Sequence, residues 1–435
     1  MTTPDVLEEL HDWLGDEWDP DLTVEAWWEK LGTAGWAAPT LPVNAFGRGV
    51  ARSVGVQIAR AIHEFGALGA PDGLGLLLAA PTIVDHGTPE QIDTYVRDIV
   101  TGQRSWCQLF SEPGAGSDLA GLATRAIEDG DEWIVNGQKV WTSLAQSADL
   151  GMLLARTAPE LPKHQGITYF ALDMHQPGVE IRPLREMTGH AMFNETFMTD
   201  ARVATSAIIG DRNGGWAVAN STLAHERAGL GSGGGGGSGV RVTPGTIAGN
   251  LTRRAGDFVR PPKPRTATGE ADKPSRRPGM HDLVIDLARH YGTNADPGIR
   301  QDLVRLYTLN ELGRFNAERL KAYRSVGQDI PGMGNISKLS MSAIMRLVRD
   351  VGMRVVGSDG MLHAYAGEDQ AVLNEATGNP LLPGVTTTAL YAQAPAIYGG
   401  TDQVQRNIIG ERVLGLSKEP GNDRNVPFAD LPRNG

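Results

Sequence analysis

The sequence predicts an α+β fold with a helical N-terminal domain, a middle antiparallel β domain and a C-terminal helical bundle. Apolar residues recur every three to four positions in residues 1–105 and again after residue 217, the spacing of amphipathic helices. Between them, residues 106–216 hold short β-prone runs broken by Gly, Asp and Pro. A chain of 435 residues is long enough to bury more than one core. We therefore expect three domains, 1–105, 106–216 and 217–435.

The N-terminal part carries clear helix signals. The stretch "LTVEAWWEKLGTAGW" has helical apolar spacing. The stretch "HGTPEQIDTYVRDIVTG" begins with Thr88 as an N-cap, Pro89 in the first turn and Gln91 at the capping-box position, and Gly102 follows its end. These signals predict a helix from Pro89 to about residue 100.

The middle part, residues 106–216, is predicted to form β-strands. "EWIVNGQKVWTS", "GMLLART" and "GITYFALDM" are rich in β-branched and aromatic residues, and the Asn-Gly pair in the first run predicts a hairpin turn. After residue 217, helical spacing returns in residues 282–292, 297–325 and 335–356.

An unusual stretch interrupts the last part of the chain. Residues 231–239 are seven glycines and two serines, and residues 241–280 contain nine Lys/Arg against three Asp/Glu together with several prolines. We expect residues 231–280 to be an irregular, poorly ordered insertion, because glycine and proline disfavour helix and sheet. It is either a solvated loop or a loop that folds over an anionic ligand or partner.

Composition excludes several classes of protein. The chain is 40% hydrophobic and 21% charged and has no apolar run long enough to span a bilayer. The acidic start "MTTPDVLEELHDWLGDEWDP" lacks the features of a signal peptide, and the single cysteine, Cys107, fits a reducing compartment, so we expect a cytoplasmic protein. The net charge of −11 makes nucleic-acid binding unlikely. The histidines show no metal-binding spacing, and "GSGGGG" lacks the strand and helix of a dinucleotide site.

The stretch "CQLFSEPGAGSDLAG", residues 107–121, indicates a ligand-binding site. Gly114 and Gly116 let the backbone approach a ligand, and Ser111 and Ser117 supply hydroxyls. The motif is followed by "NGQKVWTS" and, near the C-terminus, by "AIYGGTDQVQRNIIGERVLGL". Together, in this order, the three resemble the acyl-CoA dehydrogenase family, and the resemblance covers nearly all of the chain outside 231–280.

The resemblance implies that FAD binds between the β domain and the C-terminal helices. Gln108, Phe110 and Ser111 match the strand along the isoalloxazine ring. Trp141 matches an aromatic residue against that ring and Ser143 a hydroxyl near N5, since a hydride-accepting flavin needs fixed donors and a flat apolar wall. The remaining implied cofactor contacts are Gly116, Ser117, Thr401 and Gln403, with Ser117 also lining the acyl-CoA.

The chain departs from the family at the catalytic base. Many members have Y-E-G-T where this chain has Tyr398-Gly399-Gly400-Thr401, and Gly399 cannot remove a proton. Some branches place the base on a helix whose motif ends in Glu-Arg, which "LAHERAGLG" resembles. Glu226 is therefore the candidate base, with Arg227 near the CoA chain and Gly399 lining the substrate site.

A second departure concerns assembly. The family's R-x-x-F-G segment is not found between 227 and 335, which leaves homo-oligomer and hetero-oligomer both open. Branches lacking it include mixed assemblies acting on bulky acyl-CoAs such as steroid side chains. The expected activity is dehydrogenation of an acyl-CoA, with electrons passed to an electron-transferring flavoprotein. The alternatives are a non-catalytic subunit of a heteromeric enzyme and a flavoprotein that binds nucleic acid through the insertion.

Overall fold

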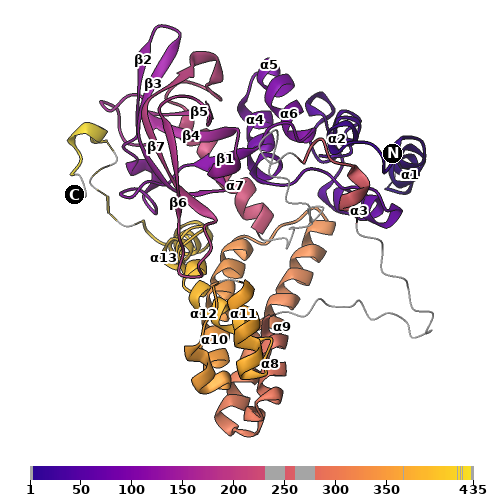
Figure 1. The fold of residues 1–435 in the computed structure, drawn as a ribbon. Helices are drawn as coiled ribbons and strands as arrows, with labels where there is room; N and C mark the ends of the chain where they lie inside the picture. The colour runs from indigo at the N-terminus through magenta and orange to yellow at the C-terminus, as the bar shows by residue number, and fades with distance from the viewer. Residues whose placement is uncertain are drawn as a thin grey trace. The chain divides into compact units, whose positions relative to one another are not determined.

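The structure is a computed structural model that describes residues 3–230, 250–259, 280–365, 367–418, 420, 421, 423 and 425–432. The chain forms two compact units (Figure 1). The first contains Met1–Leu184, Ala191–Thr266 and Gly421–Gly435, and the second contains Arg185–His190 and Ala267–Pro420. The α+β class is confirmed, whereas the boundaries at residues 105 and 216 stay predictions.

The first unit opens with a helical layer whose core is rich in tryptophan. Trp27, Trp28 and Trp36 are fully or almost fully buried. Trp27 Nε1 donates to the Leu68 carbonyl at 2.6 Å, and Trp28 Nε1 to the Gly69 carbonyl at 2.9 Å, so both indole N–H groups are paired inside the core. The helices are α1 (Thr3–Glu17), α2 (Val24–Thr33), α3 (Arg52–Phe65), α4 (Ala80–His86), α5 (Pro89–Gln91) and α6 (Arg97–Val100), with a short 3-10 turn η1 (Val43–Ala45) and two π-helical segments, η2 (Gly75–Ala79) and η3 (Ile92–Val96).

The predicted helix start at Thr88 is confirmed. The Thr88 hydroxyl accepts from the Gln91 N–H, and Gln91 Oε1 accepts from the Thr88 N–H, which is a complete capping box. The Gln91 amide also donates to the carbonyls of Ser206 and Ile208, at 2.8 and 2.7 Å. One buried side chain therefore caps a helix and attaches it to the end of the β domain.

The middle of the first unit is a seven-stranded sheet, in the order β1-β4-β2-β3-β7-β6 with β5 beside β4. Most pairs are antiparallel, but β1 and β2 run parallel to β4. The strands are β1 (Trp106–Leu109), β2 (Arg125–Asp129), β3 (Glu132–Ser143), β4 (Leu150–Arg156), β5 (Ile167–Asp173), β6 (Val179–Leu184) and β7 (Phe193–Ala204).

The hairpin predicted at Asn136-Gly137 is wrong. Both residues lie inside the long strand β3, where the register against β7 shifts between Val135 and Gly137. A Cβ on Gly137 would lie 2.4–2.7 Å from atoms of Thr124, so this glycine serves a close backbone approach. The turn between β2 and β3 is at Gly130, whose φ of 69° suits glycine.

Helix α7 (Gly215–Leu230) follows the sheet and packs against α4, η2 and β5 (Figure 1). The Thr222 hydroxyl is buried, 3.0 Å from the Thr82 hydroxyl and 3.4 Å from the Tyr169 hydroxyl. His86 Nε2 lies 2.7 Å from the Ser221 hydroxyl. Polar contacts on one face thus fix α7 against the helical layer and the sheet.

Part of the predicted insertion, residues 250–259, is described by the structure and contains the short 3-10 turn η8 (Ala255–Phe258). This segment lies along the start of α2, where its Leu251 and Arg253 carbonyls accept from the Glu25 and Val24 N–H groups, at 3.0 and 2.9 Å. Leu251 and Ala255 are buried. The segment therefore satisfies backbone donors that the first turn of α2 leaves free. The remainder of the predicted insertion, 231–249 and 260–279, lies outside the described residues.

The second unit is a helical bundle, and its three predicted helices are confirmed. The elements are α8 (Met280–His290), α9 (Pro297–Ser325), α10 (Met333–Val356), α11 (Gly367–Thr377), α12 (Leu382–Tyr391) and α13 (Asp402–Ile408), with short turns between them. Its core includes Val284, Leu287, Leu306, Val351 and Leu382. Across the described parts of both units, every helix is too short or too polar to cross a lipid bilayer.

We predict that Gln91→Ala lowers the free energy of unfolding by about 1–3 kcal/mol, because it removes a cap and two hydrogen bonds to the partly exposed Ser206 and Ile208 carbonyls. Urea denaturation followed by tryptophan fluorescence measures this change. The matched control is Gln57→Ala, since Gln57 is exposed and bonds only within α3. Equal effects of the two substitutions would contradict the proposed attachment.

Candidate functional site

A buried ion pair holds the glycine-rich loop after β1. Lys139 Nζ lies 2.8 Å from Glu112 Oε1 and 3.0 Å from the Phe110 carbonyl, and both charged side chains are buried. The carboxylate also accepts from the N–H groups of Ala123 and Thr124, at 2.7 and 2.9 Å. Glu112 thus has hydrogen-bond donors on both carboxylate oxygens and serves a structural role.

Burial acts in opposite directions on the pKa values of Glu112 and Lys139. Burial alone would raise the pKa of Glu112, but Lys139 and the surrounding donors outweigh it and hold that pKa below its ordinary value. Burial lowers the pKa of Lys139, and Glu112 opposes that effect. The pair anchors both ends of the loop 112–123 to strand β3.

Arg156 holds the same loop from a second side. Its Nη2 donates to the Ala120 and Leu122 carbonyls, at 2.6 and 3.2 Å. The guanidinium lies 3.9 Å from the centre of the Phe428 ring, so the C-terminal tail covers it. Burial lowers the pKa of Arg156 to about 10.

The loop between these anchors is open. Gly114, Gly116 and Ser117 are exposed, and a Cβ built on either glycine would meet no atom within 4 Å. Ser111 is half-buried, and its carbonyl accepts from the Val140 N–H at 2.9 Å. This contact places the loop beside the part of β3 that leads to Trp141.

Trp141 stands at an irregularity in β3. The register against β7 shifts between Lys139 and Thr142, and Trp141 adopts φ 61°, a left-handed conformation that is rare for an aromatic residue. Its side chain is 60% exposed and meets Phe193 edge to face at 5.8 Å between ring centres. Ser143, two residues on, is half-buried. The end of β3 therefore exposes an aromatic ring two residues before a half-buried serine.

The Phe110 ring is not available to a ligand. It is buried and packs edge to face on Tyr169, with 6.0 Å between ring centres. Any cofactor contact of Phe110 has to use the backbone. The sequence motif identified the segment, but the direction of its side chain depends on the pleat of β1 and on burial.

Glu226 lies on α7 and is partly buried. Burial raises its pKa above the ordinary value of a glutamate, while the Gln108 amide and the Arg227 charge lower it. Next to it, His225 Nε2 lies 2.9 Å from Asp85 Oδ2 and fixes this turn of α7 to α4. The Gln108 side chain and the Arg227 charge thus both favour the ionised form of Glu226.

The C-terminal motif lies in the second unit. Gly399 and Gly400 have φ values of 62° and 79°, and the Gly399 carbonyl accepts from Gln405 Nε2 at 2.7 Å. The Thr401 hydroxyl caps α13 by accepting from the Val404 N–H, and Gln403 is exposed. A glutamate at position 399 would be strained in this backbone.

Sequence reasoning missed two structural residues of the site. Gln405 is buried and accepts from Asn335 Nδ2 at 2.6 Å, so it fixes the glycine pair to α10. Lys139 was not singled out either. A lysine at an inward-facing position of a predicted strand is a usable signal, because a lysine is rarely buried unless it is paired.

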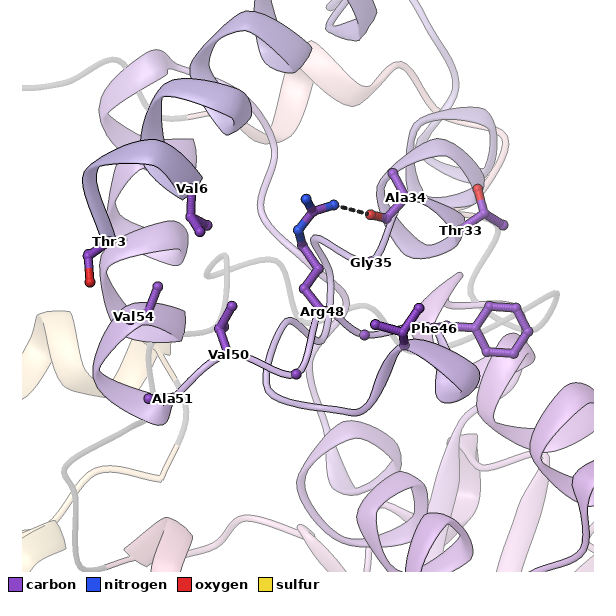
Figure 2. Close-up of a pocket in the computed structure, with 13 residues that line it drawn as sticks. Thr3, Val6, Thr33, Ala34, Gly35, Phe46, Arg48, Val50, Ala51 and Val54 are labelled. Carbon is purple, nitrogen blue, oxygen red and sulfur yellow. Dashed lines mark hydrogen bonds between the residues drawn. The ribbon is translucent and has the colours of Figure 1, made fainter. Parts of the chain in front are cut away.

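A cavity elsewhere in the first unit is separate from these residues. It lies among the N-terminal helices, and its lining includes Val6, Phe46 and Val54 (Figure 2). Arg48, also in the lining, donates to the Ala34 carbonyl at 3.1 Å and stacks 3.7 Å from the centre of the Trp36 ring. None of the candidate cofactor or substrate residues lines this cavity. Among the described residues, no group of His, Cys, Asp and Glu is arranged to bind a metal ion.

We predict that Lys139→Met costs about 3–5 kcal/mol of folding free energy, because it leaves the Glu112 charge buried without its partner. Urea denaturation measures the loss. Arg60→Met removes one partner of the exposed pair with Glu64 and should change stability by less than about 1 kcal/mol. A loss no larger than that of Arg60→Met would show that the buried pair does not anchor the loop.

Comparison with known proteins identifies the family. Residues 6–103, 107–204 and 280–414 match the N-terminal, middle and C-terminal domain models of acyl-CoA dehydrogenase. The acyl-CoA dehydrogenase IpdE1 of Mycobacterium tuberculosis is 34% identical over 397 residues, 91% of this chain and 88% of that protein. FadE34 of the same organism is 34% identical over 392 residues, 89% of this chain and 46% of that protein.

Solved structures share the fold. The ChsE4–ChsE5 complex of Mycobacterium tuberculosis aligns with a TM-score of 0.62 at 23% identity, over 96% of this chain and 98% of that chain. The steroid acyl-CoA dehydrogenase Tcur3481–Tcur3483 aligns with a TM-score of 0.65 at 23% identity, over 96% and 98%. On the three domain matches and the match to IpdE1, the chain belongs to the acyl-CoA dehydrogenase family of flavoprotein oxidoreductases.

Proposed function

We propose that this protein dehydrogenates an acyl-CoA thioester between its α and β carbons with bound FAD, using Glu226 as the base. The observation that carries the proposal is the environment of Glu226. It is a partly buried carboxylate with a raised pKa, it lies beside the strand that leads into the glycine-rich loop, and Gly399 offers no alternative base.

The described residues fit FAD. Trp141 keeps an exposed ring in a costly left-handed conformation, which is understandable if the ring forms a wall for another flat ring. Gly116 and Ser117 lie on a loop with space for a ligand, Ser111 adds a hydroxyl from the segment just after β1, and Ser143 adds one from the end of β3. Thr401 and Gln403 are proposed as contacts from the C-terminal motif. Bound FAD supplies the hydride acceptor for the β carbon.

Glu226 would take the proton from the α carbon. Because burial raises its pKa, its carboxylate has more affinity for a proton than an ordinary glutamate, as a base for a weak carbon acid requires. Arg227, the next residue on α7, would face the CoA chain, and Ser117 and Gly399 would line the thioester site.

The substrate class and partners are further parts of the proposal. Two structures with the same fold are a steroid acyl-CoA dehydrogenase and the ChsE4–ChsE5 complex, and a similar protein from Acetobacterium woodii is subunit CarC of a caffeyl-CoA reductase–Etf complex. We accordingly propose a bulky acyl group, an electron-transferring flavoprotein as electron acceptor, and an oligomer of one or two chain types. Gly399 favours one competing function, a non-catalytic subunit, which the tests below separate from catalysis.

The cofactor prediction is that the purified protein binds FAD and that Trp141→Gly weakens FAD retention about tenfold or more. Removing the ring deletes stacking, whereas glycine accepts the left-handed backbone without strain. Phe46→Gly is the matched control, because Phe46 is also an aromatic residue at positive φ but lines the N-terminal cavity. Flavin absorbance after gel filtration reports retention. A folded protein that never takes up added FAD would refute this assignment.

The base prediction concerns Glu226→Gln. We expect it to retain FAD and acyl-CoA but to reduce its flavin at least about a hundredfold more slowly, the scale of general-base loss. Stopped-flow bleaching with a panel of acyl-CoAs measures the rate. Glu128→Gln, which removes an exposed carboxylate paired with Arg212, should bleach at the wild-type rate. Wild-type bleaching by Glu226→Gln would exclude Glu226, and no bleaching of the parent protein would favour the non-catalytic subunit.

A further inference from the structure

Two basic side chains, Arg156 and Lys163, each contact both the glycine-rich loop 112–123 and the C-terminal tail (Asp423 and residues 425–432). Arg156 ends β4, and Lys163 lies in the connection between β4 and β5. Both are largely shielded from solvent, since Arg156 is 3% exposed and the Lys163 side chain 12%. A shielded cation needs partners, because an unpaired charge away from water is costly. The loop and the tail supply these partners together.

Lys163 joins one carboxylate of the loop to one of the tail. Its Nζ lies 2.9 Å from Asp118 Oδ2 and 2.6 Å from Asp423 Oδ2. Burial would lower the pKa of Lys163, but the two carboxylates outweigh it and hold that pKa above its ordinary value. Asp118 directly follows Ser117, which is one of the proposed ligand contacts. A change at Asp423 can therefore reach the ligand side of the loop through one ammonium group.

Arg156 makes the second connection. Besides its bonds to the Ala120 and Leu122 carbonyls, its Nη1 donates to the Lys163 carbonyl at 2.6 Å. The Phe428 ring of the tail lies 3.9 Å from the guanidinium carbon. The two cations thus form one connected group, with the loop on one side and the tail on the other.

The tail itself is held in place by its backbone. The Phe428 and Ala429 N–H groups donate to the Leu161 and Pro159 carbonyls, each at 2.9 Å. The last residues of a domain are usually poorly ordered unless they dock on the rest of the structure. This tail docks on the connection between β4 and β5, next to the two cations that hold the loop.

We propose that the tail is a positioning element of the glycine-rich loop, and that docking of the tail and ligand binding at Gly116 and Ser117 strengthen each other. The inference rests on the proposed function, which assigns FAD to this loop. A Cβ on Gly114 or Gly116 would meet no atom within 4 Å, so the anchors at its ends determine how far the loop moves. Coupling is reciprocal: a ligand that prefers the held loop favours the docked tail by the same factor.

The first experiment needs no ligand. Cys107 is the only cysteine of the chain and is buried, so Gly114→Cys provides one accessible thiol for a spin label on the loop. We expect Phe428→Ala to make this label more mobile in its electron paramagnetic resonance spectrum. Without the ring, water reaches the Arg156 guanidinium and weakens its hydrogen bonds to the loop.

Phe258→Ala is the matched control for this experiment. Phe258 is also a half-buried ring of the first unit that stacks on an arginine, with 4.5 Å from the Arg253 guanidinium carbon to the ring centre. It should leave the loop label unchanged. If Phe428→Ala misfolds, Asp423→Asn replaces it, because it removes the charge of the tail that pairs with Lys163 and should mobilise the label in the same direction.

The second experiment uses FAD as the probe. Titration of the FAD-free protein, followed by flavin fluorescence, should give a Kd about fivefold or more higher for Phe428→Ala than for wild type, the lower end of typical coupling between sites. With the spin label on Ala429→Cys instead, an exposed position of the tail, added FAD should make the label less mobile. A contact that only stabilises the fold changes neither the Kd of the folded protein nor the response of the tail to FAD.

The outcomes separate the two proposals. An unchanged loop label in folded Phe428→Ala, or an equal change in Phe258→Ala, overturns the role of the tail. An FAD Kd that Phe428→Ala leaves unchanged overturns the coupling. A loop label that becomes mobile in a protein whose parent binds no FAD supports positioning of the loop by the tail and refutes the proposed function instead.

Discussion

The buried ion pair between Lys139 and Glu112 is the constraint on which the site depends. It joins the end of β1, the start of β2 and the middle of β3, and every oxygen of the carboxylate is used. A buried pair of this kind contributes little net stability compared with an apolar core, but it is costly to break. Its effect is geometric, because it fixes where the open loop begins and ends relative to Trp141.

The site therefore combines rigid anchors with free surface. Glu112, Lys139 and Arg156 hold the loop at its ends, whereas Gly114, Gly116 and Ser117 between them stay open to a ligand. Glu226 is likewise a candidate functional group on a fixed element. His225 and Thr222 hold α7 in place, and burial raises the pKa of the Glu226 carboxylate. Strain and unsatisfied groups gather at such sites because the surrounding structure tolerates them.

Local signals in the sequence predicted local structure well. The capping box at Thr88 and the helical spacing of 297–325 involve residues a few positions apart, so the pattern contains the whole interaction. The Asn-Gly turn prediction is wrong because Gly137 allows a close approach of Thr124, the residue just before strand β2. Similarly, nothing within residues 250–259 indicates that they pair with the first turn of α2.

For the candidate site, the resemblance selected segments better than side chains. It pointed to β1, β3 and α7, but whether Phe110 faces the core is decided by packing between distant elements. The hydrogen bond between His225 and Asp85, for example, joins positions 140 residues apart. Periodicity and composition carry no information about such pairs.

The contact between Arg156 and Phe428 has a consequence for how the chain can be divided. The last described residues belong to the first unit, although the whole second unit precedes them in sequence. Phe428 and Ala429 also donate backbone hydrogen bonds to the Leu161 and Pro159 carbonyls. A fragment that stops before the second unit would therefore lack Phe428, and the buried Arg156 guanidinium would become exposed. Neither unit is one continuous segment of the sequence. Truncating the chain, or fusing one continuous segment to another protein, would therefore remove the contact between Arg156 and Phe428.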